Sequence, residues 1–211
     1  MLSLSAALQL ATHLALATAQ VAYTDPRSGG GRMLTVQNEP LNIIVSGLSS
    51  PEVLSTRGIV NFGNAIGYGD DCFGIHLGGP QAADLGDGNG LREDFGSKPI
   101  GTCLETLIGG NHYRVFRQNG GRANTGALFL AASKEESVTE HHDIVPNGDQ
   151  VVSEATGGKR SFSSIDYTST VTYVDGLLAP GAEGINHNIA IDGRVAILTI
   201  TATTDPVYVA G

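Results

Sequence analysis

The pattern of apolar and polar positions is clearest in one stretch, residues 111–132. Residues 112–117 are β-branched, aromatic and basic, and residues 125–132 form a second run that is almost entirely apolar. Asn119-Gly120-Gly121 stands between them, and because Asn and Gly adopt the positive φ of a tight reversal, the stretch predicts a β-hairpin. Since residues 127–132 are apolar throughout, we expect this strand to be buried on both faces and central in its sheet.

Shorter β patterns lie on both sides of this hairpin. Residues 41–45 and 163–174 are rich in the side chains that suit strands. Asp192-Gly193 is a second two-residue hairpin signal, and it predicts that residues 185–191 pair with residues 194–203. The alternation of side chains in residues 194–203 supports a strand there.

Helical signals are sparse. Ser133-Lys134-Glu135-Glu136 fits a capping box and predicts a short helix, whereas residues 58–79 alternate loosely and residues 81–95 have the composition of a loop. The sequence therefore predicts an all-β, or at least β-rich, fold with at most one or two short helices. An antiparallel β-sandwich is the expected architecture, and a closed β-barrel is the alternative.

The N-terminus has the pattern of a secretory signal peptide. Residues 2–16 are mostly Leu, Ala and Ser, and Ala17-Thr18-Ala19 provides the motif that a signal peptidase needs. A buried N-terminal helix is the alternative, while polar residues within the run argue against a membrane anchor. We expect a signal peptide at residues 1–19, a flexible mature N-terminus at 20–32 and a single β-rich domain at 33–211 of a secreted, extracellular protein.

Cys72 and Cys103 are the two cysteines of the chain. In a secreted protein an even count predicts a disulfide bond, which would stabilise the fold by ~3 kcal/mol in the chain-entropy description. Two buried free thiols are the alternative reading, and it becomes the better one if the signal peptide is not real.

The chain is acidic, with 12 Lys and Arg against 21 Asp and Glu and a formal net charge of −9. Affinity for nucleic acid or for an anionic membrane depends on clustered positive charge, so neither is an expected partner. An unidentified extracellular partner or a carbohydrate is expected instead. The absence of Trp argues against a typical sugar-stacking platform.

The sequence lacks the established catalytic and cofactor motifs. It has no nucleophile elbow of the Gly-x-Ser-x-Gly type, no His-Glu-x-x-His metal helix and no phosphate-binding loop. The oxygen-rich loop with Asp84, Asp87 and Asn89 fails the EF-hand register, which leaves a weaker calcium site of another type as the alternative to an ordinary acidic loop. No other cofactor and no metal ion are expected.

Nine residues in three polar stretches are the candidate site residues. They are Asp70, Asp71 and His76; Asn111, His112 and Arg114; and His141, His142 and Asp143. An Asp–His pair in a cleft can act as acid and base, and a polar strand face beside an aromatic ring suits recognition of sugars or acids. The structural alternatives are a simple hydrogen bond, a solvated strand face and a solvated helix end.

Three strings of residues are distinctive. They are Gly69-Asp70-Asp71-Cys72-Phe73-Gly74-Ile75-His76, Gly109-Gly110-Asn111-His112-Tyr113-Arg114 and His142-Asp143-Ile144-Val145-Pro146-Asn147-Gly148. In these strings the chain resembles a group of uncharacterised small secreted proteins of filamentous fungi. The resemblance covers most of the mature chain and implies a fungal, extracellular protein, but it implies no activity.

Two functions are expected from these observations. The first is a secreted, non-catalytic binding or surface-interaction protein, which the β-rich pattern and the missing catalytic motifs favour. The alternative is a secreted hydrolase acting on glycans, in which the His and carboxylate residues of the three stretches meet in one cleft. The sequence alone cannot pair the available carboxylates, which include Glu93, Asp94, Glu105, Asp143 and Asp166.

Overall fold

The computed structural model describes residues 20–29, 40–70, 72, 90–98, 100–120, 123–137, 139, 144–146, 148–185 and 188–204. Its strands are β1 (Ile43–Val45), β2 (Tyr68–Gly69), β3 (Gly90–Glu93), β4 (Gly110–Gly120), β5 (Ala123–Glu135), β6 (Ile144–Pro146), β7 (Arg160–Phe162), β8 (Ile165–Val174) and β9 (Val195–Thr204). Its helices are α1 (Pro26–Gly29), α2 (Thr56–Ala65), α3 (Gly101–Ile108) and α4 (Gly148–Thr156).

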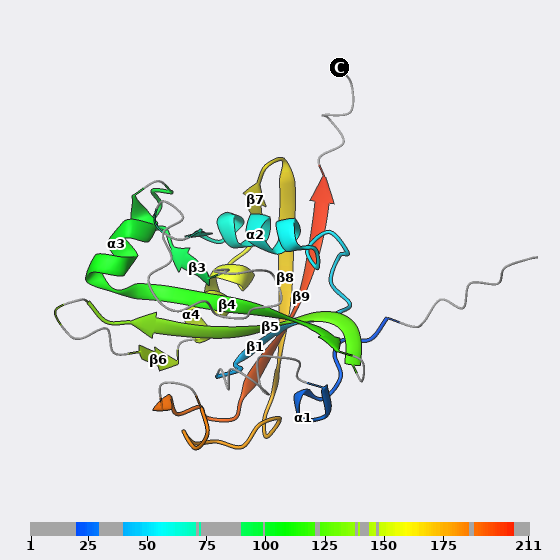
Figure 1. Ribbon diagram of the computed structural model, residues 1–211. Coiled ribbons are helices and arrows are strands. Elements are labelled where there is room, and N and C mark those ends of the chain that lie inside the picture. The colour runs from blue at the N-terminus through cyan, green and yellow to red at the C-terminus, as the bar shows by residue number, and fades with distance from the viewer. Residues whose placement is uncertain are drawn as a thin grey trace, which may run out of the picture.

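The described strands form one sheet in the order β2-β3-β4-β5-β1-β9-β8-β7, and β6 also pairs with β5. All neighbours are antiparallel except β1 and β9, which run parallel. Figure 1 shows β4 and β5 running across the direction of β8 and β9, so the sheet is strongly curled. The predicted β-rich class is confirmed. The predicted two-sheet antiparallel sandwich is wrong for the described strands, and so is a closed barrel, because the single mixed sheet ends at β2 and β7.

The first predicted hairpin is confirmed and lies at the centre of the sheet. β4 and β5 are antiparallel, with Phe116 opposite Phe129, and their register shifts once near the turn. On its other side β5 pairs with β1, where Leu130 is opposite Ile43. Residues 127–132 are all buried, as their continuous apolar pattern predicts.

The second predicted hairpin is wrong. The segment after Asp192 does form a strand, β9, but β9 pairs with β8 and with β1. Among the described residues, Ile191 makes only an isolated bridge to Gly181. Gly193 has a φ of +82°, and Asp192 Oδ1 accepts a hydrogen bond from Arg194 N at 2.8 Å. The Asp-Gly pair therefore forms a turn that leads into β9 and does not join two neighbouring strands.

Helices are more numerous than the sequence pattern predicts. α2 lies in the loosely alternating region, and its N-cap Ser55 accepts a hydrogen bond from Gly58 N at 2.9 Å. The helix predicted to begin at Ser133 is wrong, because residues 133–135 continue β5 and pair with β6. Strand pairing outweighs the local capping signal there. β3 likewise lies within the predicted loop at residues 81–95.

Apolar side chains cover both faces of the sheet. On one face Tyr113 and Leu198 pack with apolar side chains of α2 and α4, and on the other Phe116 and Phe129 pack with residues of β1 and β9. Successive residues of a strand point to opposite faces. His112 therefore lies on the same face of β4 as Phe116.

The described part of the N-terminal segment, residues 20–29, is tied to the end of β4. Thr24 N donates to Gln118 Oε1 at 2.9 Å, and Gln118 Nε2 donates to Thr24 O at 2.8 Å. The predicted signal peptide at residues 1–19 lies outside the described residues. No helix in the described part of the chain has the length and apolar character needed to cross a membrane.

Candidate functional site

A buried polar cluster lies on the His112 face of the sheet, where β3, β4 and β5 are adjacent. In the strand register Arg92 is opposite His112 and His112 is opposite Ser133, so these residues form a row across the sheet. Glu135 follows Ser133 by two residues on the same face of β5, and Glu105 reaches the row from α3. We call Glu105, His112 and Glu135 the buried triad.

α3 is held against the sheet from two sides. The predicted disulfide between Cys72 and Cys103 is confirmed, with an S–S distance of 2.02 Å, and it ties α3 to the segment that follows β2. A Cβ atom at Gly110 would stand 2.8 Å from Glu105 Cγ, so the side chain of Glu105 needs a glycine at this position. The covalent link and this close approach together position Glu105 beside His112.

The polar atoms of the triad are only partly paired. Arg92 Nη1 donates to Glu105 Oε2 at 2.6 Å and to Glu135 Oε2 at 3.3 Å, and His112 Nε2 lies 3.0 Å from Ser133 Oγ. His112 Nδ1 is 3.6 Å from Glu105 Oε1 and 3.9 Å from Glu135 Oε1, beyond hydrogen-bond distance. Among the described residues, neither His112 Nδ1 nor Glu105 Oε1 has a hydrogen-bond partner, although their side chains are only 6% and 0% exposed.

Four of the nine predicted candidate residues are described. His112 belongs to the triad, whereas Asn111 donates through its backbone N and Nδ2 to Glu93 Oε2 at 3.0 and 2.9 Å. Arg114 is half-buried on β4, and Asp70 is exposed at the end of β2. The residues outside the described part are Asp71, His76, His141, His142 and Asp143, together with Asp84, Asp87 and Asn89 of the calcium alternative. The convergence of all three stretches therefore stays a prediction.

Sequence reasoning named Glu105 among the available carboxylates, but it did not group Arg92, Glu105 or Glu135 with His112. Arg92 fell in a predicted loop and Glu135 in a predicted helix. The alternation of side chains along an extended β5 puts Glu135 on the same face as Ser133, and the register beyond the shift near the turn puts it opposite Gly110, two residues from His112. No pattern in the sequence places Glu105, which comes from a helix that packs on the sheet.

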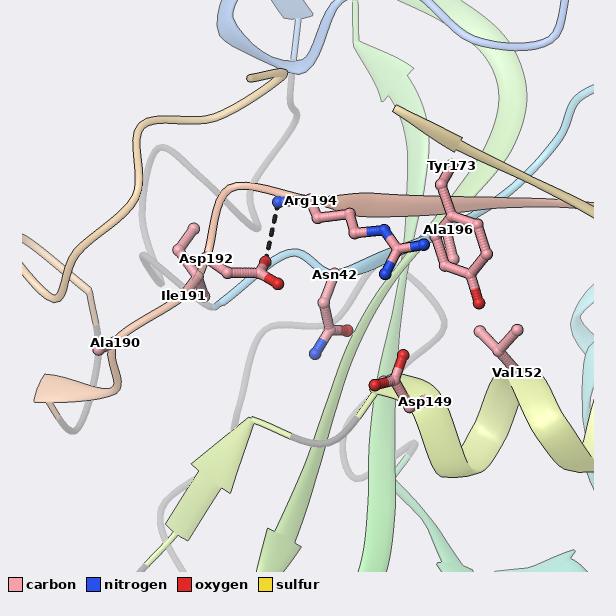
Figure 2. Close-up of a pocket in the computed structure, with 10 residues that line it drawn as sticks. Asn42, Asp149, Val152, Tyr173, Ala190, Ile191, Asp192, Arg194 and Ala196 are labelled. Atoms are coloured by element: carbon pink, nitrogen blue, oxygen red, sulfur yellow. Dashed lines mark hydrogen bonds between the residues drawn. The ribbon is translucent and has the colours of Figure 1, made fainter. Parts of the chain in front are cut away.

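An open pocket of ≈ 280 Å³ lies beside the N-terminus of α4, where β8 ends and β9 begins. Five polar side chains line it: Asn42, Asp149, Tyr173, Asp192 and Arg194. Figure 2 shows the Arg194 guanidinium and the Asp149 carboxylate facing one another across this space, with the Tyr173 ring beside them. We call these residues the open pocket.

Arg194 is the charged group that dominates the open pocket. Its guanidinium carbon lies 3.7 Å from the centroid of the Tyr173 ring, a cation–π contact that orients the side chain. Within the described part of the chain, the guanidinium makes no hydrogen bond. Asn42, in contrast, is already engaged, because its side chain exchanges hydrogen bonds of 2.6 and 3.0 Å with the backbone of Ala132. Arg194 and Asp149 are thus the groups best placed to meet a ligand.

A second pocket of ≈ 310 Å³ lies between β2 and α4 and is less suited to ligand binding. Its charged groups are already engaged within the protein. Arg160 Nη2 pairs with Glu154 Oε2 at 3.0 Å, and Glu93 accepts the two hydrogen bonds from Asn111. A ligand there would have to replace existing contacts.

The chain matches no protein-family model, no curated protein and no solved structure. Its function is therefore inferred from the chemistry of the buried triad and the open pocket. The first is closed and partly unsatisfied, and the second is open and carries charges of both signs.

Proposed function

We propose that this protein is a secreted, non-catalytic binding protein that holds a small polar ligand, a carbohydrate in the first instance, in the open pocket. The observation that carries the proposal is the stacked guanidinium of Arg194, which has no ion-pair or hydrogen-bond partner among the described residues and lies opposite the Asp149 carboxylate. The pocket lies near the lower end of the volumes typical of small-molecule sites, which suits a ligand of one or two sugar rings.

The chemistry of the pocket favours a ligand with hydroxyl groups. A carboxylate such as Asp149 accepts two hydroxyl hydrogens, and a guanidinium such as Arg194 donates to hydroxyl or carboxylate oxygens in a fixed fork. An anion alone would meet Asp149 and Asp192 as well as Arg194, so repulsion would offset much of its attraction. A neutral or weakly acidic sugar can use the charges of both signs.

Export is part of the proposal. The Ala- and Leu-rich pattern of residues 1–19 supports a signal peptide, and the Cys72–Cys103 disulfide is a link that persists in oxidising compartments. The resemblance to small secreted fungal proteins supports the same location. Microscopy or fractionation of the native host with an antibody to the mature chain would test it, and retention inside the cell would contradict it.

A panel of neutral, amino and acidic oligosaccharides, titrated by isothermal calorimetry, tests the ligand. We expect Arg194→Gln and Asp149→Asn each to weaken binding about tenfold or more, because each removes a charge-assisted contact worth ~1.5–3 kcal/mol. Arg57→Gln and Asp175→Asn are the matched controls, because both residues are exposed and neither lines the pocket. Binding that is unchanged in the pocket variants, or no binding by any sugar, would contradict the proposal.

One observation favours the hydrolase alternative. His112 lies within 4 Å of the carboxylates of Glu105 and Glu135, which is the grouping that acid–base chemistry uses. The side chains are nearly inaccessible, however, and Arg92 holds both carboxylates. Chromatography of the same sugars after incubation with the protein would reveal cleavage if this alternative were correct.

A further inference from the structure

We propose that the buried triad binds a divalent transition-metal ion, with zinc as the ion that best fits its ligands. This site shares no residue with the open pocket and does not depend on the function proposed for it. The triad offers one imidazole nitrogen and two carboxylate oxygens. Zinc and its neighbours in the first transition row accept this mixed set, whereas calcium and magnesium favour oxygen ligands alone.

The unsatisfied atoms of the triad point to a cation. When His112 Nε2 donates to Ser133 Oγ, the lone pair on Nδ1 is left on the side of the Glu105 and Glu135 carboxylates. Nδ1 and Glu105 Oε1 are then two buried acceptors with no donor among the described residues. Buried acceptors in this state are costly, and a cation between them would satisfy both.

The spacing of the triad atoms suits a shared ion. Around a tetrahedral zinc with bonds of ~2.0–2.2 Å, neighbouring ligand atoms stand roughly 3.3–3.6 Å apart. In the triad, Nδ1 is 3.6 and 3.9 Å from the two carboxylate oxygens, and all three ligand atoms lie within 4.8 Å of one another. These separations are too long for hydrogen bonds but require only small shifts for metal ligation.

The neighbours of the triad have the roles that metal sites need. Arg92 binds Oε2 of both glutamates, whose Oε1 atoms lie 3.6 and 3.9 Å from His112 Nδ1, while Ser133 fixes the imidazole through its other nitrogen. The side chain of Glu135 is 13% exposed and gives the ion a route from solvent. Three protein ligands leave a fourth position for water, as in zinc sites that are not closed.

Zinc titration of the disulfide-intact protein tests this site. The protein is first freed of metal with EDTA and then titrated with zinc chloride by calorimetry, with cobalt absorption as a second reading of the ligand set. We expect one zinc ion per chain at the triad. Glu135→Gln and His112→Gln should weaken this binding at least ~100-fold. Glu136→Gln, an exposed neighbour of Glu135, is the matched control and should bind as the wild type does.

Glu135→Gln keeps the size of the side chain at the most exposed triad position, so it tests ligation even if His112→Gln does not fold. Zinc binding that is equally tight in folded Glu135→Gln would place the ion elsewhere and overturn the proposal. A preference for calcium over zinc would overturn the assigned class of metal. Failure of the folded wild type to bind zinc would overturn the proposal as a whole.

Discussion

The buried triad and the open pocket contain the same kinds of groups in opposite environments. Each has an arginine near two carboxylates. Arg92 contacts both Glu105 and Glu135 away from solvent, whereas Arg194 stacks on an exposed tyrosine and makes no ion pair with a described residue. The disulfide-tethered α3 closes the first site, and the second lies open at the ends of two strands.

The difference shows how environment decides what a charge can do. In water an unpaired guanidinium is well solvated, and an exposed ion pair contributes little to stability, so Arg194 can remain available for a ligand. Inside the protein a charge without a partner is costly, so Arg92 must stay paired. The open pocket is therefore suited to the exchange of a ligand. In the triad, the charges of the buried side chains must stay paired with one another or with a bound ion.

The sharpest way to break this comparison is to remove each arginine. Arg92→Met leaves two largely buried carboxylates without their shared cation, and we expect it to lower the free energy of unfolding by ~3–5 kcal/mol. Arg194→Met loses an exposed cation–π contact and should cost about 1 kcal/mol or less. Urea denaturation followed by circular dichroism measures both changes.

Zinc sharpens the same experiment. If the triad binds the ion, saturating zinc should restore part of the stability that Arg92→Met loses, because the ion replaces the missing positive charge. Zinc should not reduce the difference in free energy of unfolding between Arg194→Met and the wild type, because Arg194 lies outside the triad. An equal loss of free energy of unfolding in the two arginine variants would contradict the inference that only Arg92 must stay paired.

The disulfide provides the next largest expected effect. The double variant Cys72→Ser, Cys103→Ser releases a link between residues 31 apart, and we expect a loss of about 3–4 kcal/mol from the free energy of unfolding. Since Cys103 lies in α3 two residues before Glu105, zinc affinity should also fall. The open pocket lies on other elements, so its ligand affinity at a temperature where the variant is folded should not change. Loss of both affinities together would indicate a general loss of structure.

The elements that the sequence predicts correctly are those whose pattern is local. The central hairpin is encoded by two runs and an Asn-Gly-Gly turn, and β8 and β9 by their β-branched side chains. The failures involve distant partners. Nothing near Asp192-Gly193 reveals that the following strand inserts between β1 and β8, and the capping signal at Ser133 gives way to pairing with β6. Pairing across the sheet decides such segments, and a single sequence does not display it.

The candidate sites were predictable to different degrees. His112 is predictable because it shares one strand face with Arg114 and the aromatic Phe116, and the disulfide follows from the even count of cysteines in a predicted secreted chain. Glu105 joins the triad only because α3 folds back onto β4, and Arg194 becomes exposed beside Tyr173 only because those strands pair in one register. Charged residues are common along any chain, so their grouping appears only once the packing is known.

The smallest predicted effect concerns buried tyrosine hydroxyls without a hydrogen-bond partner, and it tests how much such a group contributes to stability. The hydroxyls of Tyr68, Tyr113 and Tyr167 also have no hydrogen-bond partner among the described residues. These are neutral groups in an apolar cluster, unlike the facing acceptors of the triad. We therefore expect Tyr113→Phe to change the free energy of unfolding by about 1 kcal/mol or less at pH 7. A loss of several kcal/mol would show that the hydroxyl is in fact paired.

At alkaline pH we expect the same substitution to make the protein more stable than the wild type. Burial raises the pKa of Tyr113 well above its usual value, and that of Tyr167 to about 12. Above pH ~10 the unfolded chain releases a proton that folded Tyr113 retains, so the stability of the wild type must fall as the pH rises. Tyr113→Phe lacks this titration, so its stability relative to the wild type should rise by about 1.4 kcal/mol between pH 7 and pH 11. A difference in free energy of unfolding between the two proteins that stays constant from pH 7 to pH 11 would contradict this prediction. It would mean that Tyr113 ionises in the folded state, so that the apolar cluster around it is more open to water than its burial indicates.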